Sequence, residues 1–269
     1  MKKYIRALSI AGFDGSGGAG IQADIKMFSA LGCYGMTVLT ALPIQNTQGI
    51  KKCYSLPISS IAEQISAIIE DIGVDVIKIG MLERTEVIEV VATSLRAYGS
   101  LKIVCDPVMV SKNGERLITK EAITALKELI FPISNIITPN IFEAGELLGK
   151  NILSYDDMYK AAFDLLNVAN SVLLKGGHIM QETPFSKDLL VLNQEEFLWL
   201  EEERIVTNNT HGTGCSLSAA IAAFLAHNSD IKLAVQQAKN IITKAIYHGS
   251  KYEIGKGHGP IHHFFNFWN

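Results

Sequence analysis

Residues 4–25 read YIRALSIAGFDGSGGAGIQADI: an apolar run, a glycine-rich loop and the start of an amphipathic stretch. This order predicts a buried strand over residues 4–11, a tight loop and then a helix, which is the first half of a βαβ unit. Gly15, Gly17 and Gly20 have the G-x-G-x-x-G spacing of dinucleotide-binding loops. Since such a loop follows the carboxyl end of a strand, we expect a small-molecule site there.

A dinucleotide site also needs an acidic residue about 20 residues further on, where it holds a ribose. That place reads TALPIQNTQG over residues 40–49 and contains no carboxylate. The sequence therefore disfavours a dehydrogenase. A purely structural turn would leave Asp14 and Asp24, which flank the loop, unexplained. A P-loop is not indicated either, because neither Gly-Lys pair of the chain is followed by Ser or Thr.

Short apolar runs and amphipathic stretches alternate along the rest of the chain, as in a parallel sheet covered by helices on both faces. Further strands are predicted over residues 35–41, 74–79, 102–106, 135–138 and 171–175. Helices are predicted over residues 58–72, 214–226 and 230–249, with another opened by an N-cap pair, Ser154 and Asp157. Alternating runs within residues 188–206 predict an antiparallel hairpin at one sheet edge. We expect one α/β domain over residues 1–269.

Composition narrows the classes of function. The chain of 269 residues is 48% hydrophobic and carries a net charge of −3, which disfavours nucleic acid or an anionic membrane as a partner. No apolar run approaches the roughly 18 residues of a membrane span. The first 15 residues resemble a signal peptide, but Asp14 stands where a cleavage site belongs, so we expect a buried strand. Cys33, Cys53, Cys105 and Cys215 lack paired spacing and are expected to be free thiols of a cytoplasmic protein.

Residues 209–228, NTHGTGCSLSAAIAAFLAHN, place two glycines and a cysteine where a helix begins. Backbone N–H groups at a helix N-terminus bind anions, and Gly212 and Gly214 would let the amides of Gly212, Thr213, Gly214 and Cys215 approach a phosphoryl group closely. The helix dipole would also lower the pKa of the Cys215 thiol, so that the thiolate could accept a proton from an alcohol. The alternative is a small buried cysteine that starts a core helix.

Polar residues follow three other predicted strands. Asp106 ends one strand, and Asn140 and Glu143 follow the next, a set that suits Mg²⁺ with most of its waters retained. The alternative for Glu143 is an exposed first-turn residue favoured by the helix dipole. Lys175, in LLKGGH, ends another strand and could meet nucleotide phosphates. Ligands of open α/β sheets lie beyond the carboxyl ends of the strands, where all these residues converge.

The C-terminal stretch GKGHGPIHHFFNFWN, residues 255–269, contains three histidines. Their spacing fits no zinc pattern, and the aromatic residues indicate a packed terminus.

These motifs together resemble the ribokinase-like superfamily and, within it, the hydroxymethylpyrimidine/phosphomethylpyrimidine kinases of thiamine biosynthesis. The resemblance covers nearly the whole chain and is carried in order by AGFDGSGGAGIQADIKMFSALG, TALPIQNTQG, KIGML, DPVMV, ITPNIFEA, LLKGGH, NTHGTGCSLSAAIAA and GKGHGPIHHF. It implies a three-layer α/β/α sandwich with a mostly parallel central sheet and a small antiparallel edge hairpin. It also implies ATP and Mg²⁺ as cofactors, and a homodimer.

The resemblance further implies roles for individual residues. Gln45 would read a ring nitrogen and the amino group of the pyrimidine, with Asp24, Gly12, Met81 and Val108 around the ring. Cys215 would be the base, and Gly212, Thr213 and Gly214 would complete the anion hole with it. Lys175 and Asn140 would meet the ATP phosphates, and Asp106 with Glu143 would govern Mg²⁺.

Two alternatives remain open from the sequence. A pyridoxal kinase of the same subgroup, or an enzyme of dual specificity, is disfavoured by Gln45 and its neighbours in QNT and by Lys175. A non-catalytic binding protein on the same scaffold is disfavoured because the expected catalytic set is complete. The chain departs from the family pattern at Gly15, at Pro43 and at Asn208, the last of which bears on ATP affinity.

Overall fold

A computed structural model describes residues 2–109, 118–179 and 184–268. Its main sheet has eight strands in the order β10-β9-β8-β7-β6-β5-β1-β2. The six strands from β2 to β8 in this order are mutually parallel, and β9 is antiparallel to both of its neighbours. The strands are β1 (Ile5–Ala11), β2 (Cys33–Leu39), β5 (Val76–Ile79), β6 (Ile103–Cys105), β7 (Ile136–Ile137), β8 (Val172–Lys175), β9 (Phe185–Val191) and β10 (Phe197–Glu203).

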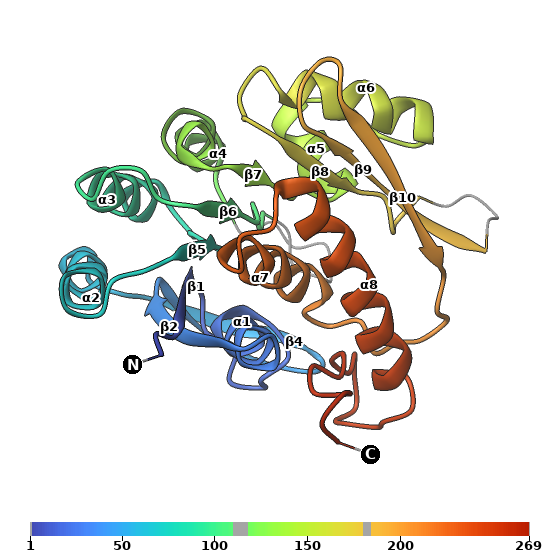
Figure 1. The fold of residues 1–269 in the computed structure, drawn as a ribbon, viewed down its shortest axis with the longest axis horizontal. Helices are drawn as coiled ribbons and strands as arrows, with labels where there is room; N and C mark the ends of the chain where they lie inside the picture. The colour runs from blue at the N-terminus through green and yellow to red at the C-terminus, as the bar shows by residue number, and fades with distance from the viewer. Residues whose placement is uncertain (1, 110–117, 180–183, 269) are drawn as a thin grey trace.

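Helices cover both faces of this sheet, which gives the three layers expected from the sequence (Figure 1). One face carries α2 (Ile58–Asp71), α3 (Thr85–Arg96), α4 (Lys120–Ala125), α5 (Ile141–Leu148) and α6 (Tyr155–Leu165). The other carries α1 (Gly20–Ala30), α7 (Thr213–Ala226) and α8 (Ile231–Gly249). In the described part of the chain, no helix is long and apolar enough to cross a membrane.

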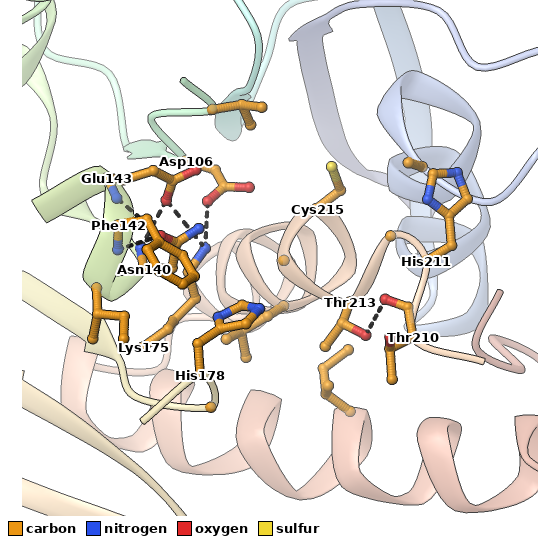
Figure 2. Close-up of a pocket in the computed structure, with 18 of the residues that line it drawn as sticks. Asp106, Asn140, Phe142, Glu143, Lys175, His178, Thr210, His211, Thr213 and Cys215 are labelled. Atoms are coloured by element: carbon orange, nitrogen blue, oxygen red, sulfur yellow. Dashed lines mark hydrogen bonds and ion pairs between the residues drawn. The ribbon is translucent and has the colours of Figure 1, made fainter. Parts of the chain in front are cut away.

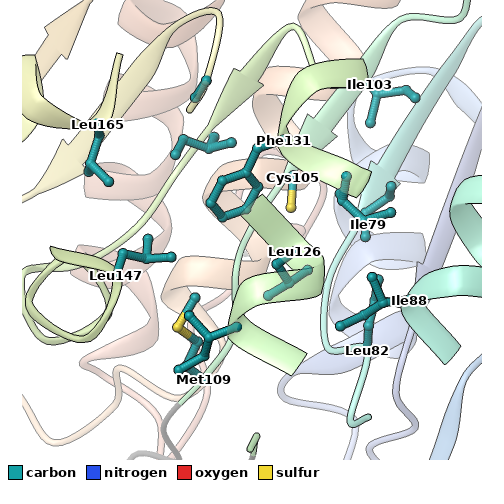
Figure 3. Packing of buried hydrophobic residues seen from close by; sticks show 14 of the residues in the cluster. Ile79, Leu82, Ile88, Ile103, Cys105, Met109, Leu126, Phe131, Leu147 and Leu165 are labelled. Atoms are coloured by element: carbon teal, nitrogen blue, oxygen red, sulfur yellow. The ribbon is translucent and has the colours of Figure 1, made fainter. Parts of the chain in front are cut away.

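Two hydrophobic cores follow from the alternation of side chains along each strand. In β6, Ile103 and Cys105 pack into the core beneath α2 to α6, whereas Val104 points into the core beneath α1, α7 and α8. Figure 3 shows the first core, in which Phe131 and Leu126 pack near Cys105 and Ile79. Because both faces of the inner parallel strands are buried, their sequences are nearly continuous apolar runs, whereas the edge strand β2 has an exposed Tyr34.

Most of the predicted elements are present. The hairpin within residues 188–206 is β9–β10, and Asn193 forms its turn by accepting hydrogen bonds from the N–H groups of Glu195 and Glu196. Ser154 and Asp157 form the predicted capping box at the start of α6. The second strand lies at Cys33–Leu39 rather than at 35–41.

One element was not predicted. A separate two-stranded antiparallel ribbon, β3 (Ala41–Asn46) with β4 (Gly49–Ser55), follows β2 directly. Pro43 lies within β3, which is compatible with pairing because the ribbon has only two strands and the other edge of β3 needs no hydrogen-bond donors. The ribbon carries Gln45 to the carboxyl ends of the main strands, where the candidate site lies.

Candidate active site

A cavity of about 1740 Å³ lies beyond the carboxyl ends of the parallel strands. Five of the six parallel strands, all except β2, contribute a lining residue at or just beyond their carboxyl ends. These residues are Gly12 after β1, Met81 after β5, Asp106 after β6, Asn140 after β7 and Lys175 at the end of β8. The sequence prediction that these motifs converge is therefore confirmed by the sheet topology.

A buried charged cluster forms one side of the cavity (Figure 2). The Lys175 ammonium lies 2.8 Å from Asp106 Oδ1 and 4.0 Å from Glu143 Oε2. Thr138 Oγ1 donates to the same Asp106 oxygen over 3.0 Å. Burial opposes ionisation of Asp106, but Lys175, Lys78 and the hydrogen bonds outweigh it and lower the pKa of this carboxyl. Asp106 is therefore a fixed anion.

Glu143 behaves differently from Asp106. Burial, together with the charge of Asp106, raises its pKa to about 7 even though Lys175 opposes the shift. Its side chain is only 4% exposed, so the alternative of an exposed first-turn residue is wrong. Glu143 Oε2 accepts a hydrogen bond from the Asn140 N–H over 2.7 Å, and Asn140 Oδ1 accepts from the N–H of Glu143 over 2.9 Å. This capping box fixes both side chains at the start of α5.

The residues that could hold a metal ion are few. Within the residues described, no group of three or more His, Cys, Asp and Glu side chains is arranged to bind one. Asp106 and Glu143 line the cavity as a pair of carboxyl groups. Such a pair suits Mg²⁺, which usually takes one or two carboxylates and completes its shell with waters and substrate phosphates.

Residues 210–215, which we name the anion loop, lie next to the charged cluster of Asp106, Glu143 and Lys175. Gly212 has φ 77°, and a Cβ there would lie 1.7 Å from the Gly18 carbonyl oxygen, so only glycine fits. The Thr213 side chain donates to the Thr210 carbonyl over 2.8 Å. A Cβ at Gly214 would lie 3.3 Å from Lys175 Nζ and 3.7 Å from Asp106 Oδ2. The first turn of α7, whose N–H groups have no partner within the helix, therefore faces the charged cluster.

Cys215 lines the cavity, as predicted, but its protonation state differs from the prediction. Burial raises the pKa of its thiol to about 11, with Asp24 and Asp106 adding to the shift and Lys78 opposing it. The expectation of a lowered pKa was wrong. It considered only the dipole of the helix that Cys215 begins, whereas the removal of the thiol from water by the surrounding structure has the larger effect. At neutral pH Cys215 is a thiol.

Asp24 does not line the cavity. It is fully buried and forms an ion pair with Lys78, itself fully buried, with 2.8 Å between Nζ and Oδ2. Ser9 Oγ donates to the same oxygen over 2.5 Å. Lys78 reaches the cavity, so Asp24 acts on a ligand only through Lys78. Sequence reasoning missed Lys78, although a lysine between two isoleucines of a buried strand signals a partner.

The other half of the cavity is less charged. Gln45, Met81 and Val108 line it together with Gly12. A Cβ at Gly12 would lie 2.7 Å from the terminal methyl of Met81, so a larger residue at this position would displace the Met81 side chain. The ribbon register shifts between Ile44 and Gln45, and Gln45 Nε2 donates to the Phe13 carbonyl over 3.2 Å. Such a bulge redirects side chains.

His211 was also missed by sequence reasoning. Its Nε2 lies 2.8 Å from Asp14 Oδ2, and it lines the cavity. Asp14 is fully buried and accepts further hydrogen bonds from Ser16 and from the Ala19 N–H. Burial opposes ionisation of Asp14, but these hydrogen bonds lower its pKa to about 2. The Asp14–His211 pair thus joins the glycine-rich loop to the anion loop.

The fold and this site together define an α/β protein that handles phosphate: a helix N-terminus faces a lysine and two buried carboxyl groups at the carboxyl ends of parallel strands. The family described as phosphomethylpyrimidine kinase matches residues 14–262. The hydroxymethylpyrimidine/phosphomethylpyrimidine kinase of Escherichia coli is 41% identical over 268 residues, which cover 99% of this chain and 100% of that protein. This chain therefore belongs to the phosphomethylpyrimidine kinase family.

One longer relative and two solved structures are also similar to this chain. The thiamine biosynthesis bifunctional protein ThiED of Geobacter sulfurreducens is 44% identical over 95% of this chain, which spans only 51% of that longer protein. The phosphomethylpyrimidine kinase structure from Clostridium difficile has a TM-score of 0.79 at 42% identity and covers 90% of this chain and 99% of its own. The ADP complex of Bacillus subtilis pyridoxal kinase has a TM-score of 0.88 at 36% identity, with 97% and 98% covered. The fold is ribokinase-like.

Proposed function

We propose that this chain is an ATP-dependent kinase that phosphorylates 4-amino-5-hydroxymethyl-2-methylpyrimidine and then its monophosphate. The observation that carries the proposal is the convergence of three parts on one cavity. The anion loop and the Asp106–Lys175 pair form the phosphoryl end, and the surface around Gln45 forms the end for a small polar ring. The membership of the family supports the same reaction.

In the proposed reaction, the hydroxymethyl oxygen attacks the γ-phosphorus in line. An O–P bond forms as the bond to the bridging β,γ oxygen breaks, and ADP leaves with that bond's electron pair. The protein makes little covalent contribution to such transfers, so positioning of the reactants and stabilisation of charge account for most of the catalysis. The N–H groups of Thr210, His211 and Thr213 donate to carbonyls of the protein. Those of Gly212, Gly214 and Cys215 would stabilise the equatorial oxygens, and each donor contributes about 10²–10³ in rate.

Gln45 would orient the pyrimidine by donating to a ring nitrogen or accepting from its amino group, with Gly12, Met81 and Val108 around the ring. Lys175 and Asn140 would contact the phosphates of ATP. We further propose that Asp106 and Glu143 hold Mg²⁺, through water or directly, because both carboxyl groups face the phosphoryl end. Bound Mg²⁺ would neutralise charge on the phosphates.

Cys215 is proposed to receive the hydroxyl proton. Because burial raises the pKa of the thiol to about 11, Cys215 must first release its own proton to water, a step that the charge of Lys78 favours, and the resulting thiolate then takes the hydroxyl proton. Phosphoryl transfer through a loose transition state depends little on early proton removal, so this transfer can follow bond formation. A protonated resting thiol is compatible with this order of events.

Two further proposals concern the cellular location and the oligomeric state of the enzyme. Four free thiols are consistent with a reducing, cytoplasmic location. A homodimer is proposed from the exposed Tyr4 and Tyr34 near the β2 edge, whose ring centroids lie 5.7 Å apart. Light scattering coupled to gel filtration tests it: the mass of a dimer supports the proposal, and the mass of a monomer refutes it.

Pyridoxal is the second candidate substrate, because a pyridoxal kinase structure covers 97% of this chain. The test is a competition assay in which the pyrimidine alcohol, its monophosphate and pyridoxal are offered together with ATP and Mg²⁺. Preferential phosphorylation of the two pyrimidines supports the proposal. Exclusive phosphorylation of pyridoxal would replace it, and no substrate-dependent ATP consumption would favour a non-catalytic binding protein.

A further inference from the structure

The segment that follows α8 crosses the tip of the β3–β4 ribbon. We name residues 254–260, IGKGHGP, the strap. The N–H groups of Lys256 and Gly257 both donate to Thr47 Oγ1 over 3.2 Å. The N–H of His258 donates to the Thr47 carbonyl over 2.8 Å. Three consecutive strap amides therefore converge on one residue at the turn of the ribbon.

The composition of the strap fits this close approach. A Cβ at Gly255, which has φ 67°, would lie 2.4 Å from Thr47 Oγ1. A Cβ at Gly257 would lie 2.0 Å from the Thr47 carbonyl oxygen. Either methyl group would push the strap off the ribbon, so the glycines are explained by Thr47 and not by a turn alone.

The other end of the strap holds the anion loop. The Gly259 carbonyl accepts a hydrogen bond from the His211 N–H over 3.0 Å. A Cβ at Gly259 would lie 2.1 Å from Asn209 Oδ1, and Asn209 Nδ2 donates to the carbonyls of Gly249 and Tyr252 over 2.8 and 2.7 Å. One short segment thus touches both the ribbon and the anion loop, which both line the cavity.

Core packing does not account for the contacts at Thr47. Strap residues 254–258 are all exposed, and Thr47 itself is only partly buried. A two-stranded ribbon outside the main sheet is marginally stable by itself. Its tip, two residues beyond Gln45, is therefore positioned by the strap.

We propose that Thr47 is a positioning residue: through its hydroxyl, the strap holds the ribbon so that Gln45 faces the pyrimidine. This inference rests on the proposed function, since it assigns a consequence for pyrimidine binding. Thr47 also lines the cavity, but its hydroxyl oxygen accepts the two strap N–H groups, so we assign its effect on the pyrimidine to the placement of Gln45. The anion loop keeps its separate attachment to the strap through Gly259, so ATP binding does not depend on the Thr47 hydroxyl.

The test compares Thr47→Val, which keeps the shape and loses the acceptor, with Thr47→Ser, which keeps the hydroxyl. Ser60→Ala removes an exposed hydroxyl that donates to the Pro57 carbonyl, away from the cavity, and serves as the control. For Thr47→Val we expect the KM for the pyrimidine alcohol to rise about tenfold, equivalent to about 1.4 kcal/mol. The KM for ATP should be unchanged, and Thr47→Ser and Ser60→Ala should resemble the wild type.

Hydrogen exchange of the ligand-free protein provides a readout independent of turnover. Amides of residues 41–55 should exchange faster in Thr47→Val than in Thr47→Ser, because the ribbon loses two of its three hydrogen bonds to the strap at Thr47. Wild-type exchange and wild-type KM in Thr47→Val would overturn the inference, as would equal impairment by the valine and serine variants. If the wild type does not phosphorylate the pyrimidine, the proposed function fails, while the exchange comparison still decides whether the strap holds the ribbon.

Discussion

The substitution Gly214→Ala, at the centre of the site, should lower kcat without lowering the stability of the fold. The added methyl group would lie 3.3 Å from Lys175 Nζ, the far end of a flexible side chain, and 3.7 Å from Asp106 Oδ2. The fold can accept it with a shift of a few tenths of an ångström. Alanine is also a better helix former than glycine, by up to about 1 kcal/mol in a helix interior. The free energy of unfolding should therefore stay the same or rise slightly.

Activity should respond in the opposite direction. The methyl group occupies the space between the first turn of α7 and the Lys175–Asp106 pair, where we place the migrating phosphoryl group. Alanine keeps its own N–H, but its methyl group would hold the phosphoryl group away from the amides of the first turn. Loss of one such N–H contact lowers kcat by about 10²–10³, and we expect a fall of that size for Gly214→Ala. Steady-state ADP release measures kcat, and calorimetry measures Tm.

Gly212→Ala provides the contrast. Its methyl group would lie 1.7 Å from the Gly18 carbonyl oxygen, at a residue whose φ is 77°. Both the clash with backbone and the left-handed conformation destabilise the protein, so Tm should fall clearly. The reasoning is refuted if Gly214→Ala has wild-type kcat, or if it loses as much stability as Gly212→Ala.

Three further predictions concern single side chains. Gln45→Ala should raise the KM for the pyrimidine by about 10–100-fold and leave the KM for ATP unchanged, because a polar group of the ligand left without its hydrogen bond costs about 1–3 kcal/mol. An equal effect of Gln48→Ala, a substitution on the same ribbon, would contradict this prediction. In a Cys53→Ser background, alkylation of Cys215 by iodoacetamide should still accelerate above pH 9, since burial raises the pKa of this thiol to about 11; a plateau below pH 8 would be inconsistent with burial. Burial raises the pKa of Glu143 from 4.5 to about 7. Between these two pH values the folded protein keeps a proton on Glu143 that the unfolded chain loses. The free energy of unfolding should therefore fall as the pH rises from 4.5 through 7. Glu143→Gln should remove this fall, and urea unfolding should show a gain of roughly 1–3 kcal/mol over the wild type at pH 8 and little gain at pH 4.

The fold was largely predictable because its signals are local. Apolar runs predicted the buried parallel strands, and the Ser154–Asp157 pair predicted a helix start that the structure contains. The β3–β4 ribbon gave no such signal. Residues 51–55 of β4 are all exposed, so no alternation of buried and exposed residues marks this strand.

The site was predicted where topology alone brings residues together. Asp106 and Lys175 are 69 residues apart, but both end parallel strands, and their side chains meet at 2.8 Å. The pairing of Asp14 with His211 spans 197 residues and involves loops, whose courses follow no such rule. The pKa of Cys215 depends on burial, which the sequence around a helix start does not reveal.

The central claim is that the anion loop binds the phosphoryl group while it is transferred to a pyrimidine alcohol, which Gln45 of the β3–β4 ribbon holds in place. Time-resolved ³¹P nuclear magnetic resonance of the wild type with ATP, Mg²⁺ and 4-amino-5-hydroxymethyl-2-methylpyrimidine tests it most directly. The account predicts a monophosphate signal that rises first and then gives way to a diphosphate, with matching formation of ADP. Conversion of ATP to ADP and inorganic phosphate, with no phosphorylated pyrimidine, would contradict it.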